Sequence, residues 1–362
     1  MNTPHLRLIA LEITRTCTLH CKHCRGNSQD TSYADELTFG EIQSILDNAA
    51  SFSNPIIIIT GGEPLTREDV FDITAYSTSL GLRTVLATCG HFLNDETVQN
   101  LIDTGISRIS VSLDGATPEV HDNFRGMAGA FETAIRGITT ARNHGLEFQI
   151  NSTLTAFNID DIEALHDLAC SLGAAGFHPF LLVPMGRGSD LVDCALSPEE
   201  YEDAIIRIAK IAAHSPLEIK PTCCPHYSRV IRQMNTLETP ISPSSSTSPK
   251  SAKGNFTNHT AIKGCIGGKN FIFISHIGKV QICGFLEVEA GDLRNNNYDL
   301  QSIWETSEFL NEIRRTDDYQ GKCGICEYRN VCGGCRARAY YSSGDYMGVE
   351  PKCIYIPGTA MK

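Results

Sequence analysis

Three cysteines near the N-terminus are spaced to bind a metal centre. Cys17, Cys21 and Cys24 form a C-x3-C-x2-C loop that directly follows the apolar run LRLIALEI at 6–13. A cubane iron–sulfur cluster normally has four thiolate ligands. Three thiolates would leave one iron without a protein ligand, and an open position is typical of a catalytic metal site. The loop therefore predicts a centre at which a substrate or cofactor binds.

A zinc ion is the alternative occupant of this loop, with His20 or His23 completing a site of three thiolates and one imidazole. The segment TGGEP at 60–64 favours the cluster, because it follows the next apolar run, IIII at 56–59. Its paired glycines allow a close approach of the backbone to a ligand, and Glu63 offers an acceptor for a cationic amine. The two motifs together predict a cofactor site.

A second group of cysteines lies near the C-terminus. Residues 265–353 hold seven of the 15 cysteines but have little helical periodicity, so we expect metal rather than an apolar core to order this region. A four-cysteine zinc ribbon is one possibility, although it leaves three cysteines unexplained and its two pairs are close together. The seven are Cys265, Cys283, Cys323, Cys326, Cys332, Cys335 and Cys353.

Alternating strands and helices are predicted to position the first group of cysteines. The strand candidates are 6–13, 55–60, 83–88, 108–113, 147–154 and 177–183, with helical patterns between them. Six such repeats predict parallel βαβ units, in an α/β partial barrel or an open doubly wound sheet. Active sites in these folds lie at the C-terminal ends of the strands. Both the cysteine loop and TGGEP follow strand candidates directly.

The bulk composition excludes several classes of protein. The 362 residues carry a formal net charge of -12, which repels nucleic acids and anionic membranes, so we expect neither as a partner. No apolar run has the length of a membrane span, and the N-terminus lacks the features of a signal peptide. Clustered cysteines in such a chain indicate metal or redox chemistry rather than disulfides. We therefore expect a cytoplasmic protein that works in anaerobic conditions.

A change in composition divides the chain. The segment PISPSSSTSPKS at 240–251 is rich in serine and proline and poor in apolar residues, which is typical of a linker or an insertion. We predict a barrel domain at 1–234, a linker or insertion at 235–262, and a small cysteine-rich domain at 263–362.

Over about residues 6–215 the sequence resembles the radical S-adenosylmethionine (SAM) superfamily. The resemblance rests on the C-x3-C-x2-C loop, on GGEP, and on SVSLDG at 110–115. It implies a partial (β/α)6 barrel and a [4Fe-4S] cluster bound by Cys17, Cys21 and Cys24. SAM would chelate the open iron and be cleaved to methionine and a 5'-deoxyadenosyl radical.

The same resemblance implies which residues contact SAM. Gly62 and Glu63 would contact the methionyl amine, and Ser112 and Arg125 lie where related enzymes hold the ribose or the carboxylate. The residues expected near the adenine are His23, Leu182 and Val183. For Ser112 and Arg125, strand-end capping or an ion pair is an equally good explanation. No catalytic side chain is assigned.

The C-terminal cysteines resemble the SPASM extension of some radical SAM enzymes, which binds two auxiliary [4Fe-4S] clusters. By that pattern, one cluster is held by Cys323, Cys326, Cys332 and Cys353, and the other by Cys265, Cys283 and Cys335. The second set lacks a fourth cysteine. Either its last iron is open, or the segment TCCPHY at 222–227 supplies Cys223 or Cys224.

Several segments most resemble the heme synthases of the siroheme-dependent pathway, including FLLVPMGRG at 180–188, TCCPHY and CGGCRARAYYSSGDY at 332–346. This resemblance implies decarboxylation of two propionates of iron-coproporphyrin III to vinyls, giving protoheme. The electron donor would be a ferredoxin or a flavodoxin, and an auxiliary cluster would accept the electron that each decarboxylation releases. Candidates for binding the porphyrin iron are His178 and His226. Candidates for binding its carboxylates are Arg187, Arg229, Arg232, Arg336 and Arg338.

Three other functions stay open at this point. One is a sister enzyme that removes acetate groups from a siroheme derivative. Another is a SPASM peptide or sulfatase maturase, which acts on a polypeptide. The third is a non-catalytic zinc or iron–sulfur protein. Iron content, bound porphyrin and product mass would separate them.

Overall fold

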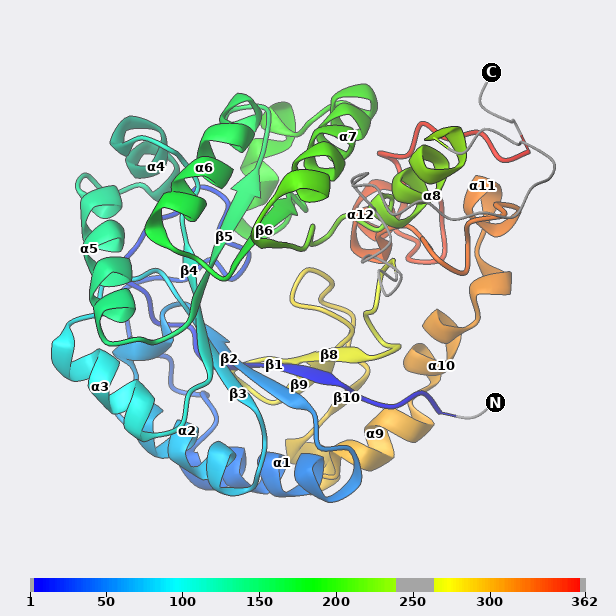
Figure 1. Cartoon of the computed structure of the whole chain (residues 1–362). Helices are drawn as coiled ribbons and strands as arrows, with labels where there is room; N and C mark the ends of the chain where they lie inside the picture. The colour runs from blue at the N-terminus through cyan, green and yellow to red at the C-terminus, as the bar shows by residue number, and fades with distance from the viewer. Residues whose placement is uncertain (1–2, 239–263, 359–362) are drawn as a thin grey trace, which may run out of the picture.

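The protein is an α/β partial barrel built on one mixed sheet (Figure 1). The computed structural model describes residues 3–238 and 264–358. Most of the predicted serine- and proline-rich segment lies outside these described residues. The predicted partial barrel is confirmed, and no helix in the described part of the chain is long and apolar enough to cross a membrane.

Seven parallel strands form the main part of the sheet, in the order in which they occur along the chain. Each of the six predicted strand segments overlaps one of them, and a short seventh strand follows. The strands are β1 (Leu8–Thr14), β2 (Ile56–Gly61), β3 (Thr84–Thr88), β4 (Arg108–Ser112), β5 (Phe148–Leu154), β6 (Gly176–Leu181) and β7 (Glu218–Ile219).

The C-terminal segment adds three strands to the other edge of the same sheet. The apolar strand β8 (Phe271–Ile274) pairs in parallel with β1, and β9 (Lys279–Gln281) and β10 (Gly291–Asp292) continue the sheet by antiparallel pairing. The sequence analysis did not predict these strands, because they are short and their partner β1 lies more than 250 residues away. The predicted division into domains stays a prediction. The sheet crosses the predicted boundary, because β8 of the predicted C-terminal domain pairs with β1 of the predicted barrel domain.

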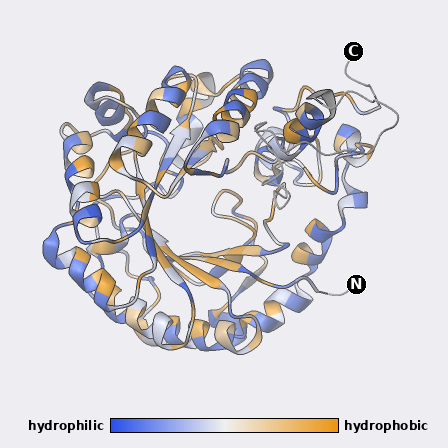
Figure 2. Cartoon of the chain, viewed as in Figure 1, coloured by the Kyte–Doolittle hydropathy of each residue, from blue (hydrophilic) through white to orange (hydrophobic). Residues whose placement is uncertain are grey.

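Helices cover the outer face of the curved sheet, as Figure 1 shows. Figure 2 shows mostly hydrophobic residues along the strands and both hydrophobic and hydrophilic residues on the helices. The helices are α1 (Phe39–Phe52), α2 (Val70–Ser79), α3 (Asp95–Asp103), α4 (Pro118–Arg125), α5 (Ala130–Asn143), α6 (Ile162–Leu172), α7 (Pro198–His214), α8 (Tyr227–Glu238), α9 (Leu300–Thr306), α10 (Glu308–Arg314), α11 (Gly321–Gly324) and α12 (Arg336–Ser343).

Local sequence signals fix where the longer helices begin. At the start of α1, the Thr38 side chain accepts a hydrogen bond from the Glu41 backbone, and the Glu41 carboxylate accepts one from the Thr38 backbone. Ser197 and Glu200 form the same capping box at the start of α7. Each box satisfies backbone N–H groups that have no partner within the helix. The helices therefore begin at defined residues, and the loops before them are held at the rim of the barrel.

Candidate active site

The cysteine loop lies at the C-terminal end of β1 and forms one wall of a cleft inside the barrel. The empty space of the cleft, which is open to solvent, is about 1080 Å³. Residues from the ends of several strands line it, as expected for parallel strands whose carboxyl ends meet on one side. The predicted residues that line it are Cys17, Cys21, His23, Cys24, Gly62, Ser112, Arg125, Leu182 and Val183.

The three thiols of the loop are largely withdrawn from water. Cys17 and Cys21 are buried and Cys24 is half-buried. Burial, together with the charges of Glu63, Cys21 and Cys24, raises the pKa of Cys17 to about 12. Burial also raises the pKa of Cys21, although Arg125 Nη1 donates a hydrogen bond to its sulfur at 3.6 Å and opposes the shift. A positively charged metal cluster would compensate the thiolates, so this donor set fits an iron–sulfur centre.

The glycines of GGEP bring the end of β2 into direct contact with the cysteine loop. The Gly62 N–H donates to the Thr14 carbonyl at 2.9 Å, and the Glu63 N–H donates to the Thr16 carbonyl at 2.8 Å. A Cβ atom on Gly62 would lie 2.5 Å from the Thr16 carbonyl oxygen, and 2.6 Å from that of Arg15. Gly62 was expected to let the backbone approach a ligand. Its missing side chain also lets the end of β2 pack closely against the loop that carries the cysteines.

Glu63 lies beneath the cleft, fully buried, and its oxygens accept hydrogen bonds from the protein. The Thr88 hydroxyl donates to the carboxylate at 2.8 Å, and the Cys89 N–H donates to Oε2 at 2.7 Å. Burial raises the pKa of Glu63, and these hydrogen bonds oppose the shift. The carboxylate therefore connects β2 to the end of β3, and its predicted contact with the methionyl amine of SAM stays a prediction.

Asp114 is buried behind the cleft, where it pairs with two of the residues that line it. Arg125 Nη2 lies 2.7 Å from Asp114 Oδ2, and the Thr153 N–H donates to Oδ1 at 2.7 Å. His23 Nε2 lies 3.6 Å from the same carboxylate, and its ring stacks on Phe124 with the centroids 4.4 Å apart. Burial lowers the pKa of His23 to about 4, so the ring is neutral at pH 7. The sequence analysis quoted Asp114 within SVSLDG but gave it no role.

Arg25 is a cleft residue that the sequence analysis missed. Its Nη2 lies 3.0 Å from Glu12 Oε1, and its guanidinium lies 4.4 Å from the centroid of the Phe273 ring on β8. Burial alone would raise the pKa of Glu12, but the charge of Arg25 and a hydrogen bond from His276 bring it down to about 2. A buried ion pair thus holds Arg25 at the cleft. In the sequence, the only indication that Arg25 lies at the cleft is its position directly after Cys24.

At least four of the five arginines predicted to bind substrate carboxylates have partners inside the protein, and their contact with the substrate stays a prediction. Arg229 pairs with Glu202 through Nη1 and Nη2 at 2.8 and 2.5 Å. Arg338 donates to Glu350 at 3.1 Å. The reason is that a buried guanidinium requires internal partners. Arg187 donates to the Cys21 and Ser28 carbonyls, Arg336 donates to the Tyr346 and Gly348 carbonyls, and Arg232 is exposed.

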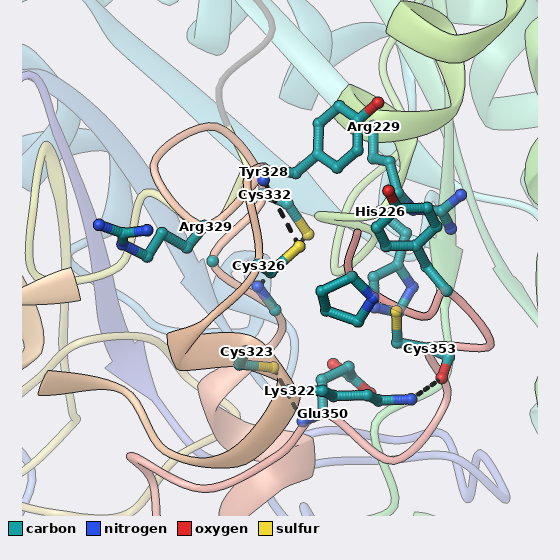
Figure 3. A pocket seen from close by; sticks show the side chains of 14 residues that line it. His226, Arg229, Lys322, Cys323, Cys326, Tyr328, Arg329, Cys332, Glu350 and Cys353 are labelled. Atoms are coloured by element: carbon teal, nitrogen blue, oxygen red, sulfur yellow. Dashed lines mark hydrogen bonds between the residues drawn. The ribbon is translucent and has the colours of Figure 1, made fainter. Parts of the chain in front are cut away.

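Four of the C-terminal cysteines surround a second cavity, shown in Figure 3. They are Cys323, Cys326, Cys332 and Cys353, the set predicted to hold one auxiliary cluster. Backbone N–H groups of Tyr328, Gly334 and Glu350 donate to the sulfurs of Cys326, Cys332 and Cys323 at 3.4, 3.4 and 3.5 Å. Such hydrogen bonds are typical of cysteines that bind iron–sulfur clusters.

The two histidines predicted as iron ligands lie in different places. His226 lines the second cavity rather than the cleft and is fully buried, and burial lowers its pKa to about 3. His178 lies on β6, where its Nδ1 hydrogen-bonds to the Gln149 side chain at 2.8 Å. Neither histidine lines the cleft that contains the cysteine loop.

Cys265, Cys283 and Cys335 lie between the two cavities. The Cys265 N–H donates to the carbonyl of Cys332 at 3.1 Å, which ties this group to the second cavity. Cys283 lies two residues before Phe285, which lines the cleft. Burial raises the pKa of Cys283, and the nearby charges of Cys265 and Cys335 raise it further. The three thiols therefore lie close to one another, beside the cleft.

Comparison with known proteins identifies the family. The model of the radical SAM superfamily matches residues 11–169. The chain is 46% identical to the AdoMet-dependent heme synthase of Methanosarcina barkeri over 97% of both chains. It belongs to the radical SAM superfamily, in the family of the AdoMet-dependent heme synthases. It is also 42% identical to the AdoMet-dependent heme synthase of Oleidesulfovibrio alaskensis, over 98% of this chain and 89% of that protein.

Solved structures of radical SAM enzymes share the fold. SuiB of Streptococcus suis bound to S-adenosylmethionine has a TM-score of 0.73 and 15% identity, over 97% of this chain and 78% of that chain. Membership of the radical SAM superfamily implies SAM and a [4Fe-4S] cluster as cofactors of this enzyme, and the thiols and the cleft of the barrel fit that pair of cofactors.

We predict that Gly62→Ala will disrupt the cysteine loop, because the added Cβ would overlap two backbone carbonyls of the loop. We expect a loss of about 100-fold in 5'-deoxyadenosine formation, the scale expected for a displacement of about 1 Å in an active site. Product formation is measured by mass spectrometry on anaerobically reconstituted protein. Gly40→Ala is the matched control, since nothing lies within 4 Å of its added Cβ. Equal rates for both variants would contradict the prediction.

Proposed function

We propose that this enzyme converts iron-coproporphyrin III to protoheme by oxidative decarboxylation of two propionates to vinyl groups. The observation that carries the proposal is the identity of 42–46% to AdoMet-dependent heme synthases over 97–98% of this chain. A further relative, the Fe-coproporphyrin III synthase of Methanosarcina barkeri, is 36% identical over 55% of this chain and 49% of its own. A tetrapyrrole is therefore the substrate class.

Each decarboxylation removes one hydrogen atom and one electron from a propionate and releases its carboxyl carbon as CO2. When bound, SAM and the barrel cluster supply the radical that takes the hydrogen, and an auxiliary cluster supplies an acceptor for the electron. The residues that we propose for the barrel cluster are Cys17, Cys21 and Cys24. In support of this, the three thiols border the same cleft as the proposed SAM contacts.

We propose that SAM is bound along the strand ends. Gly62 and Glu63 hold its methionyl end, and Ser112 and Arg125 hold its ribose or carboxylate. The geometry that supports Arg125 is its position at the cleft, with one guanidinium nitrogen on the buried Asp114 and another near Cys21. His23 and Val183 contact the adenine, and Leu182 lies beside them at the cleft.

We also propose two auxiliary [4Fe-4S] clusters, one held by Cys323, Cys326, Cys332 and Cys353 and one by Cys265, Cys283 and Cys335. The second set is the better candidate for the electron acceptor, because Phe285, two residues after Cys283, lines the cleft. The electron donor is a ferredoxin or a flavodoxin, and the enzyme works in the cytoplasm.

The proposed reaction is tested with iron-coproporphyrin III, SAM and a reductant under anaerobic conditions. We expect protoheme, whose mass is lower than that of the substrate by two CO2 and four hydrogens, because each propionic acid group loses one abstracted hydrogen atom and its carboxyl proton. Loss of acetate carboxyls from a siroheme derivative would instead identify the sister enzyme. Turnover of a peptide with no turnover of either tetrapyrrole would overturn the proposal.

We predict that replacing Cys17, Cys21 and Cys24 with alanine abolishes 5'-deoxyadenosine formation, because the barrel cluster then has no ligands. The same protein should retain about eight irons, four for each auxiliary cluster. Cys170→Ala is the control, since Cys170 lies on α6 beside His166, away from both cavities. Undiminished SAM cleavage by the triple variant would refute the role of the loop.

We predict that Cys283→Ala still cleaves SAM but forms little or no vinyl product, because the electron of the decarboxylation has lost its acceptor. A substrate-centred radical should then accumulate, visible by electron paramagnetic resonance in frozen samples. The assay measures 5'-deoxyadenosine and protoheme in the same reaction, with Cys170→Ala as control. Protoheme at the normal rate would show that the electron leaves by another route.

A further inference from the structure

The cysteine pair in TCCPHY lies at the rim of the barrel. Thr222 continues the edge of the sheet beyond β7, since its N–H donates to the Pro179 carbonyl at 2.8 Å and its carbonyl accepts from the Leu181 N–H at 3.1 Å. The chain then turns, and α8 begins at Tyr227. Cys223 and Cys224 therefore follow a strand end, as Cys17 follows β1.

Cys223 has an unusual backbone conformation. Its φ is 54°, in the left-handed region that few residues other than glycine adopt. The surrounding protein stabilises this turn, because the Cys223 carbonyl accepts hydrogen bonds from the Tyr201 hydroxyl at 3.0 Å and from Arg338 Nη2 at 2.7 Å. Left-handed backbone held in this way at a non-glycine residue is common where a side chain must point in a set direction.

The same contacts connect Cys223 to Cys335. Arg338, which binds the Cys223 carbonyl, lies one helical turn after Cys335 on α12. Glu350 accepts a hydrogen bond from the Cys335 N–H at 2.7 Å and one from Arg338 Nε at 3.1 Å. Both Arg338 and Glu350 are buried. Cys223 and Cys335 are thus fixed relative to each other by one buried set of hydrogen bonds.

The neighbours of the two thiols in TCCPHY differ. Burial raises the pKa of Cys223, and the charges of Cys335, Cys283 and Cys265 raise it further, which agrees with the hydrogen bonds that connect Cys223 to Cys335. Cys224 is buried in the apolar core and its thiol interacts with the Tyr201 side chain on α7, whereas Cys223 is partly buried and packs against that core. The two consecutive thiols therefore differ in the groups that act on them most strongly.

We infer that Cys223 is the fourth ligand of the iron–sulfur cluster proposed for Cys265, Cys283 and Cys335. This inference rests on the proposed function for the existence of that cluster. It assigns four protein thiolates to the cluster beside the cleft, so none of its irons is open to substrate. The cluster can then accept an electron from the substrate but cannot bind it.

The experiment uses the triple alanine variant of Cys17, Cys21 and Cys24 as its parent, because the barrel cluster has an open iron of its own. Cys223→Ala is added to one sample and Cys224→Ala to another, and each reconstituted protein is treated with a mild one-electron oxidant. A cubane with only three thiolates readily loses its unprotected iron and becomes a three-iron cluster, which electron paramagnetic resonance counts. This measurement needs neither SAM nor turnover.

We expect about one three-iron cluster per chain with Cys223→Ala, and none in the parent or with Cys224→Ala, because only Cys223 is a ligand. A three-iron signal with Cys224→Ala would overturn the assignment in favour of Cys224. A three-iron signal in the parent itself would also overturn the assignment, because it would show that the cluster of Cys265, Cys283 and Cys335 has no fourth protein ligand. Failure of the proposed function is distinguishable, since it appears as absence of protoheme in the turnover assay, or as zinc without iron in the parent.

Discussion

Burial of thiols, which neighbouring arginines offset only in part, is the constraint on which this structure depends. At Cys17, Cys21, Cys223 and Cys283, burial is the largest cause that raises the pKa, and neighbouring thiols raise it further. Such an arrangement disfavours thiolates unless a cation is bound among them. The fold therefore brings together cysteines that iron–sulfur clusters would stabilise, and the binding free energy of the clusters would contribute to the stability of the whole enzyme.

Buried arginine–carboxylate pairs hold side chains in fixed positions around both cavities. The Arg125–Asp114 pair lies at the cleft, Arg338 and Glu350 lie between the two cavities, and Arg229 pairs with Glu202 beside the second cavity. A buried pair of this kind adds little net stability but is costly to break, so it fixes geometry. Each pair thus fixes residues that lie beside a group of cysteines, since Arg125 contacts Cys21, Glu350 binds the Cys335 N–H, and Arg229 lines the second cavity.

The arrangement of the two cavities suits electron transfer along the molecule. The cleft contains the cysteine loop, the second cavity contains four cysteines, and Cys265, Cys283 and Cys335 lie between them. Strand β8 makes this possible, because it pairs with β1 and so anchors the C-terminal segment beside the barrel. Because β8 and β1 belong to one sheet, the proposed electron acceptor and the proposed site of hydrogen abstraction are connected through the same sheet.

The sequence by itself determined the local features. The spacing of Cys17, Cys21 and Cys24, the glycines before Glu63 and the strand–helix alternation are set by neighbouring residues, so they predicted the fold and the position of the cleft. Only the tertiary structure decided the use of Arg338, the presence of Arg25 in the cleft and the surroundings of Cys223 and Cys224. These depend on partners such as Tyr201, Glu350 and Phe273, which are distant in the chain, and no local pattern encodes which distant side chains will pack together.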